Sequence, residues 1–82
     1  KMCMIFDRFP NHLKAEVFAD FVRMKYKLSA NVYDNQDQSN AVDPFPFKLN
    51  APIVLIERHD DEKIERQVEN LVIAFDGVFA GT

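Results

Sequence analysis

Two short segments of the chain are apolar at every position, and each precedes a segment with helical periodicity. They are residues 2–6, Met-Cys-Met-Ile-Phe, and residues 53–56, Ile-Val-Leu-Ile. A strand that is apolar on both of its faces must be covered on both. We therefore predict that these segments are central strands of one sheet, with helices against one face of the sheet and a second cover on the other.

The first helical pattern covers residues 11–26. Asn11 follows a turn predicted at residues 7–11, and its side chain is suited to an N-cap. An apolar stripe at helical spacing consists of Leu13, Val17, Phe21 and Met24. Phe18 and Val22 widen this stripe, so we expect the stripe and these two neighbours to face the core.

The second helical pattern follows the strand predicted from Ile53 to about Arg58. Its apolar side chains, spaced as on one face of a helix, are Ile64, Val68, Leu71, Val72 and Phe75. Residues 60–62, Asp-Asp-Glu, supply a cap and the negative charge that the helix dipole favours in the first turn. We expect Gly77 to end this helix in the left-handed conformation.

The remaining segments predict two edge strands and a loop. Residues 28–33 alternate between apolar and polar side chains, which is typical of a half-buried strand. Residues 34–40 are uniformly polar, and we predict a loop over 34–43. The prolines of residues 43–47, Asp-Pro-Phe-Pro-Phe, favour an extended backbone. Residues 78–80 are predicted as a short fourth strand.

This order of elements predicts a single domain over residues 1–82 with a ferredoxin-like sandwich of the α+β class. With right-handed crossovers, the antiparallel sheet has the strand order 4-1-3-2 and carries both helices on one face. The two fully apolar strands then lie at the centre and the alternating strand lies at an edge, so pattern and topology agree.

The sheet face away from the helices is the main candidate surface. The pattern leaves open which alternate set points there: Cys3 and Ile5 or Met2, Met4 and Phe6 in one strand, and Ile53 and Leu55 or Val54 and Ile56 in the other. Three covers stay open: a second copy, the segment at residues 45–47, or a different protein or ligand. A homodimer is favoured, since closed symmetric dimers commonly bury such a face. The predicted interaction surface consists of Tyr33, Phe45, Phe47, Ile53, Leu55 and Phe79.

Composition narrows the class of partner. A chain of 82 residues forms one domain with a small core of its own. The chain has eight Phe and no Trp, so we expect Phe side chains to fill most of that core. Ten basic and thirteen acidic residues give a net charge of −3, and the basic residues are spread along the chain. Because nucleic-acid affinity depends on a basic patch, this distribution disfavours a nucleic-acid partner.

The candidate chemistry is sparse. His59 and the acidic residues 60–62 form the densest group of metal-capable side chains, but consecutive residues at a strand-to-helix junction point in divergent directions. His12 and His59 follow antiparallel strands, so we expect them at opposite ends of the sheet. We therefore predict a non-enzymatic protein with no metal and no cofactor.

Cysteine usage and hydropathy bear on the compartment. The single cysteine, Cys3, excludes an internal disulfide, and it lies in the apolar first strand, where a buried, unactivated thiol is the ordinary case. No segment approaches the ~20 apolar residues of a membrane span. We expect a cytoplasmic protein without membrane contact.

The order of elements and three local patterns resemble the regulator of ribonuclease activity B family, whose members inhibit ribonuclease E. The first pattern is A-x-x-F-A at residues 15–19, and the second is the Pro-Phe steps at residues 44–47. The third is a closing signature of the form L-x-x-x-Y-G-G-x-Y-D-G-W, which corresponds to residues 71–82. Phe75 and Phe79 stand at its aromatic positions, and Gly77 and Gly81 stand at two of its glycines. Ala80 and Thr82 replace its acidic residue and its Trp. The resemblance implies a ferredoxin-like fold and a regulatory role.

Together these observations predict a non-enzymatic protein-interaction or regulatory module, of ribonuclease-regulator type by resemblance. The alternative is a dimeric small-molecule-binding domain of ferredoxin-like type, with its ligand at the dimer interface. A pocket with convergent polar groups would favour the alternative.

Overall fold

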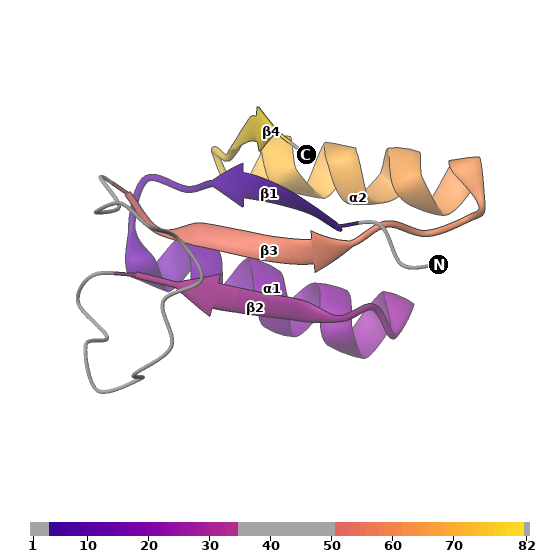
Figure 1. The fold of residues 1–82 in the computed structure, drawn as a ribbon, viewed down its shortest axis with the longest axis horizontal. Coiled ribbons are helices and arrows are strands. Elements are labelled where there is room, and N and C mark those ends of the chain that lie inside the picture. Colours follow the sequence, from indigo (N-terminus) through magenta and orange to yellow (C-terminus); the bar gives the residue numbers. More distant parts are fainter. Residues whose placement is uncertain (1–3, 35–50, 82) are drawn as a thin grey trace.

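The structure is a computed structural model that describes residues 4–34 and 51–81 (Figure 1). Within these ranges the elements are β1 (Met4–Arg8), α1 (His12–Tyr26), β2 (Ala30–Tyr33), β3 (Ile53–Glu57), α2 (Glu62–Ala74) and β4 (Val78–Gly81). The loop predicted over 34–43 lies outside the described residues except for Asp34, and so does the Pro-Phe segment at 43–47.

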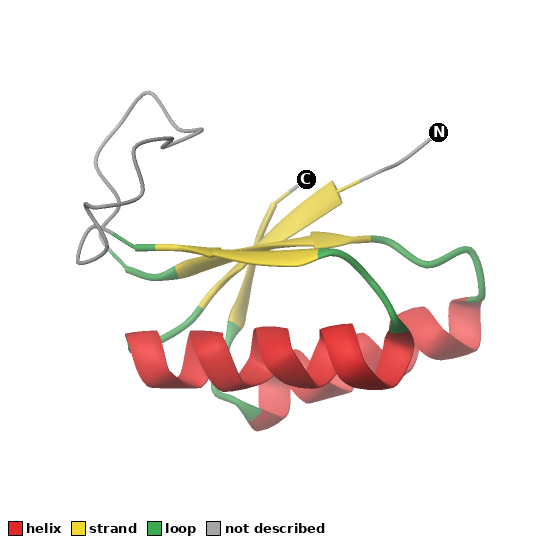
Figure 2. Cartoon of the chain, turned by 90° about the horizontal axis from the view of Figure 1, so that it is seen from below, coloured by secondary structure: helices red, strands yellow, loops and turns green. Residues whose placement is uncertain are grey.

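The four strands form one antiparallel sheet in the order β2-β3-β1-β4. This is the strand order predicted from the sequence, with the two strongly apolar strands at the centre. Both helices lie against the same face of the sheet, so the molecule has one layer of strands and one layer of helices (Figure 2). The α+β architecture is therefore confirmed.

The predicted end of the first strand is wrong by two residues. Asp7 and Arg8 were expected in a turn, but both belong to β1 and pair with Val54 and Ile53 of β3. On its other edge β1 pairs with β4, with a bulge at Phe6 and Asp7. The backbone of β1 is hydrogen-bonded to a strand on each side. This pairing keeps Asp7 and Arg8 in the strand, although their polar side chains by themselves favour a turn.

Helix α1 begins as predicted but buries a different face. The backbone N–H of Lys14 donates to Asn11 Oδ1 over 2.9 Å, so Asn11 is the N-cap. The buried face consists of Ala15, Phe18, Ala19 and Val22. The stripe expected to face the core is instead exposed, at 71% for Leu13, 42% for Val17, 42% for Phe21 and 74% for Met24. The two alanines lack bulk, which lets the helix backbone approach the sheet so that Phe18 and Val22 fill the remaining space.

Helix α2 begins at the predicted acidic cap and ends differently. The N–H of Lys63 donates to Asp61 Oδ1 over 2.9 Å. The left-handed residue after the helix is Asp76, with a φ of 60°, so the prediction for Gly77 is wrong. Glycine is required at 77 by packing, because a Cβ there would lie 2.8 Å from side-chain atoms of both Phe9 and Val72.

The core lies between the sheet and the helix layer, with aromatic rings at its centre. The ring centroids of Phe9 and Phe18 are 4.8 Å apart, and Phe75 meets Phe18 edge-on at 6.2 Å. From the sheet, Val54 and Ile56 are buried in the same cluster. These two side chains therefore face the helices.

The opposite face of the sheet carries the other alternate set. In the central strands Phe6 pairs with Leu55, and Arg8 pairs with Ile53. Because successive side chains of a strand alternate between faces, these residues point away from the helices. Of the two sets that the sequence left open, the structure therefore selects Ile53 and Leu55 in β3 for the outer face.

Candidate functional site

The structure separates the residues of the predicted interaction surface. Tyr33 and Ile53 are paired on the outer face of the sheet, beside Leu55. Ile53 is only 5% exposed, and the other two are half-buried. Phe79 is 48% exposed but pairs with Asp7, so it points to the helix side of the sheet. Phe45 and Phe47 lie outside the described residues, and the proposed role of the sheet face stays a prediction.

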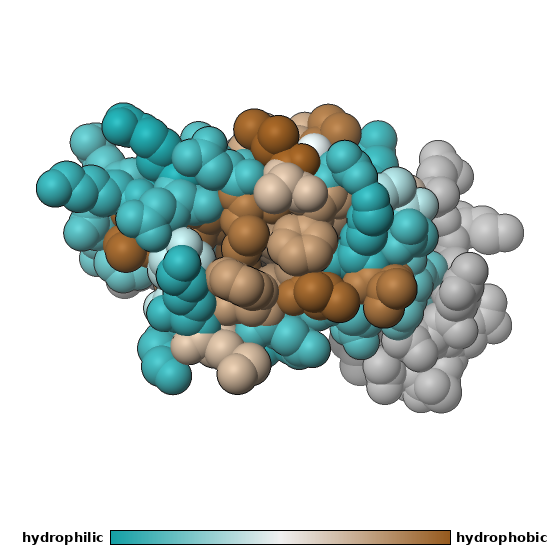
Figure 3. Space-filling model, turned by 180° about the vertical axis from the view of Figure 1, so that it is seen from behind, coloured by the Kyte–Doolittle hydropathy of each residue, from teal (hydrophilic) through white to brown (hydrophobic). Residues whose placement is uncertain are grey.

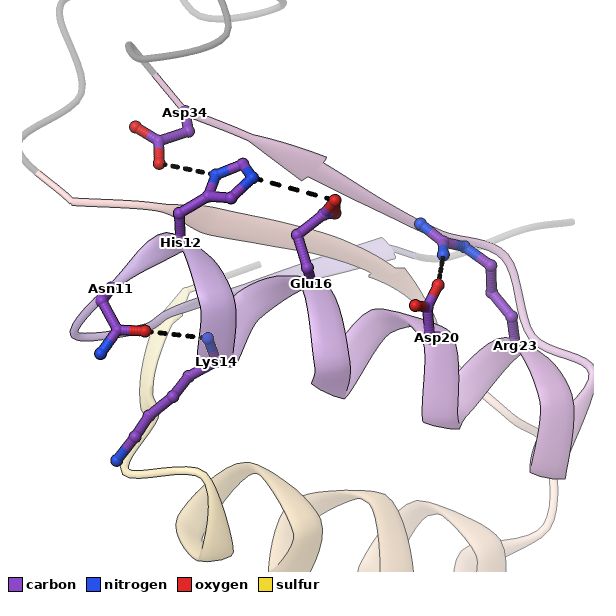
Figure 4. Close-up of polar contacts among 7 residues, drawn as sticks. All are labelled: Asn11, His12, Lys14, Glu16, Asp20, Arg23 and Asp34. Atoms are coloured by element: carbon purple, nitrogen blue, oxygen red, sulfur yellow. Dashed lines mark hydrogen bonds and ion pairs between the residues drawn. The ribbon is translucent and has the colours of Figure 1, made fainter.

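A small polar cluster joins the start of α1 to the end of β2. His12 Nδ1 lies 3.0 Å from Asp34 Oδ2, and His12 Nε2 lies 3.8 Å from Glu16 Oε2 (Figure 4). The side chain of Asp34 is nearly buried, so this contact ties the edge strand to the helix. An Asp–His contact of this kind orients an imidazole, but hydrolysis would also need an adjacent nucleophile.

The second histidine has a capping role at the other end of the sheet. The N–H of Asp61 donates to His59 Nδ1 over 2.9 Å, and the N–H of His59 donates to Glu65 Oε1 over 2.6 Å. Because β1 and β3 are antiparallel, His12 and His59 follow opposite ends of the sheet, as predicted. Among the described residues no group of three or more His, Cys, Asp or Glu side chains could hold a metal ion.

An open groove runs beside the first turns of α2. It is lined by Arg58, His59, Asp60, Glu62, Glu65, Arg66 and Glu69 and has a volume of about 550 Å³. Arg58 Nε lies 3.8 Å from Glu65 Oε2 on its wall. Small-molecule sites are mostly apolar with a few placed polar groups. The charged lining of this groove differs from that pattern.

Sequence reasoning missed Asp7, the one charged residue that the described part of the chain buries completely. Its side chain points to the helix side of β1, opposite Val54, and neither carboxylate oxygen has a hydrogen-bond partner among the described residues. Burial, the largest cause, and the negative charges of Glu65 and Glu69 together raise the pKa of Asp7 to about 7. Alternation places Asp7 on the same face as Ile5, but the sequence left open which face of this strand meets the helices, so the pattern alone could not place the carboxyl inside.

Among the described residues, four of the seven large apolar side chains that are exposed lie on the face of α1 that was expected in the core. We call Leu13, Val17, Phe21 and Met24 the α1 stripe; all four are at least 42% exposed. Figure 3 shows the helix side of the molecule, where apolar surface forms a continuous area bordered by hydrophilic side chains. On the neighbouring helix Ile73 is 62% exposed. A contiguous apolar area with a polar border is typical of a binding surface.

Charges of opposite sign border the two long edges of the α1 stripe. Glu16 and Asp20 lie on the side of α1 toward β2, and Lys14 lies on the side toward α2 (Figure 4). There Lys14 forms an ion pair with Asp76. Lys25 shares the side of Lys14, since the two are eleven residues apart, close to three full turns of an α-helix. Arg23 also lies on the side toward β2, where it donates to Ala30 O and pairs with Asp20, so this edge keeps an excess of negative charge and the other edge an excess of positive charge.

Comparison with known proteins found no matching protein family, no similar curated protein and no similar solved structure. No helix in the described part of the chain is both long and apolar enough to cross a membrane. The function must therefore be inferred from the residues of this chain.

Proposed function

We propose that the chain is a non-enzymatic protein-interaction or regulatory module that binds protein through the α1 stripe. The observation that carries this proposal is the exposure of four large apolar side chains on one face of α1, from 42% to 74%. Single exposed apolar residues are ordinary on protein surfaces, but four on one helix face form a contiguous patch.

The physical support comes from the two apolar sides of α1. One side is buried against the sheet through Phe18, Val22 and two alanines, and the opposite side carries the stripe. A helix at the surface of a globular protein ordinarily has one apolar face toward the core and a polar face toward water, so a second apolar face on α1 is a departure from that pattern. Removing a large aliphatic or aromatic side chain from water contributes about 1.5–3 kcal/mol. A partner that covers the α1 stripe would therefore gain binding energy from several side chains at once.

We also propose the finer classification of the fold. The strand order β2-β3-β1-β4 and the two helices on one face are compatible with a ferredoxin-like sandwich. The resemblance to regulators of ribonuclease activity B makes an inhibitory contact with an enzyme the specific form of regulation to consider. The acidic balance of the chain, −3, suits a protein partner better than a nucleic acid.

Site-specific photo-cross-linking in the cells that produce the chain tests the proposal. A photoreactive amino acid at Leu13, which is 71% exposed, should give adducts with protein, resolved by mass as either the chain itself or another protein. The same amino acid at Val78, which is 62% exposed on β4, is the matched control and should give fewer adducts. Absence of any adduct from Leu13 would contradict binding through the α1 stripe.

A further inference from the structure

We infer that the α1 stripe is covered by a second copy of this chain, with the two α1 helices parallel across a twofold axis. The inference rests on the proposed function and names its partner. It differs from the dimer predicted through the sheet, because the two copies meet through their helix layers.

The first step is the arrangement of charge around α1. At 100° per residue, Asp20 lies beside Leu13 on one edge of the stripe, and Lys25 lies beside Phe21 on the other edge. The Asp20 side chain is 69% exposed, and Lys25 is exposed as well. Both groups can therefore reach a partner that lies on the stripe.

The second step is the symmetry of the pairing. A twofold axis parallel to α1 exchanges the left and right edges, so the acidic edge of one copy faces the basic edge of the other. A twofold axis perpendicular to α1 makes the helices antiparallel and places acidic edge against acidic edge. Like charges in contact disfavour the second arrangement. Charge complementarity thus selects the parallel pair of identical chains.

The third step is the register. Asp20 and Lys25 are five residues apart, which is the offset from a g position to the next e position in a heptad. Val17, Phe21 and Met24 then occupy successive d, a and d positions, the apolar seam of a parallel helix pair, while Leu13 takes the preceding g position beside the seam and Lys14 the preceding a position at its end. Two symmetric Asp20–Lys25 ion pairs would border that seam, with Phe21 at its centre.

Both charged groups have weak contacts within their own chain that they can exchange. Asp20 Oδ1 lies 2.7 Å from Arg23 Nη1, and Lys25 Nζ lies 5.6 Å from the centre of the Phe21 ring. Exposed contacts of this kind contribute little to stability. Lys14 already pairs with Asp76, so of the two lysines on this edge of α1 we assign Lys25 to the contact with the second copy.

The size of this interface sets the expected affinity. One face of a helix of 15 residues lies at or below the lower end of the standard range of about 1,200 to 2,000 Å² of total buried surface. We therefore expect a dimer whose population depends on concentration, and not a permanent one.

Sedimentation velocity of the whole chain over a concentration series is the first test. The wild-type mass should rise from one copy toward two, and Met24→Glu should weaken dimerisation by about tenfold or more. Met24 is 74% exposed, so this variant should fold, which circular dichroism can check. Val78→Glu is the matched control at 62% exposure on β4 and should dimerise like the wild type.

Charge exchange tests the parallel geometry. Asp20→Lys and Lys25→Asp should each weaken the dimer, and the double variant should restore it, because the two edges stay complementary after exchange. Stronger dimerisation by Asp20→Lys alone would indicate like edges in contact and would overturn the parallel arrangement. A loss caused by Val78→Glu but not by Met24→Glu would assign the dimer to the sheet face and overturn the inference.

A monomer at every concentration would also overturn the second copy as partner. In that case the cross-linking result at Leu13 separates the two claims. Adducts with a different protein would leave the proposed function intact, whereas no adducts would remove both.

Discussion

The two apolar faces of α1 have similar side chains and opposite environments. Phe18 and Val22 are fully buried against the sheet, whereas Phe21 and Met24, one turn or less away, are 42% and 74% exposed. Hydrophobicity alone therefore does not decide which face of a helix is core. The decision depends on which face presents small residues, here Ala15 and Ala19, that allow close approach to the sheet.

Asp7 and the α1 stripe depart from the usual distribution of side chains in opposite ways, since Asp7 is a buried polar group and the stripe is an exposed apolar one. Asp7 is a carboxyl in the packed layer between sheet and helices, while apolar side chains lie in water on the other side of the helix layer. A buried polar group without a partner costs stability, and an exposed apolar patch costs solubility. Both departures from the usual distribution lie around the helix layer, where we place the interaction.

The largest effect should come from the buried face of α1. Phe18→Ala removes a fully buried ring that packs on Phe9 and Phe75, and we expect a loss of about 3–5 kcal/mol in the free energy of unfolding. Urea denaturation of the purified chain measures it. A loss below about 1 kcal/mol would show that the aromatic cluster is not the centre of the core.

The next effect is the pH dependence caused by Asp7. Because the folded-state pKa of Asp7 is raised to about 7 from its ordinary value of 3.8, the folded state binds the proton more tightly than the unfolded state. This group therefore stabilises the fold less as the pH rises from about 4 to about 7, and its contribution levels off above that. The total change should reach a few kcal/mol.

Asp7→Asn isolates this contribution, since the amide has nearly the same shape and does not titrate. We expect the variant to exceed the wild type in stability above pH 7 and to lose that advantage toward pH 4. The measurement is the difference in free energy of unfolding between the two proteins across that pH range. A constant difference would contradict a raised pKa for Asp7.

A smaller loss is expected at the end of α2. Gly77→Ala places a Cβ 2.8 Å from side-chain atoms of Phe9 and Val72, and overpacking of this kind costs about 1–3 kcal/mol. Asp76 itself has a left-handed backbone conformation, which glycine adopts without strain, so Asp76→Gly should be neutral or stabilising. Thermal unfolding of both variants distinguishes a packing requirement at 77 from a conformational one, and equal destabilisation would contradict this assignment.

The smallest effect should come from the α1 stripe of the isolated chain. Leu13→Gln and Met24→Gln change side chains that are more than 70% exposed, so the free energy of unfolding at low concentration should stay within about 0.5 kcal/mol of the wild type. The comparison with Phe18→Ala then measures the difference between the two faces directly. A large loss from either substitution would place the stripe in the core.

Much of the fold was predictable because local patterns and topology agree. The apolar runs identified the central strands, Asn11 and the acidic residues before α2 identified the helix starts, and right-handed connections led to the observed strand order. The candidate surface was less predictable. Phe79 was grouped with Ile53 and Leu55, yet the register of β4 places it on the other side of the sheet.

The sequence by itself determined the elements, their order and the strand order of the sheet, since these follow from periodicity, capping residues and the handedness of connections. Tertiary structure alone decided which apolar face of α1 is buried, that Asp7 is inside, and that Gly77 is needed for space. These features depend on distances between segments that are far apart in the chain. Local sequence shows how often apolar side chains repeat along a helix or strand, but only packing decides which face of that element is buried in the core.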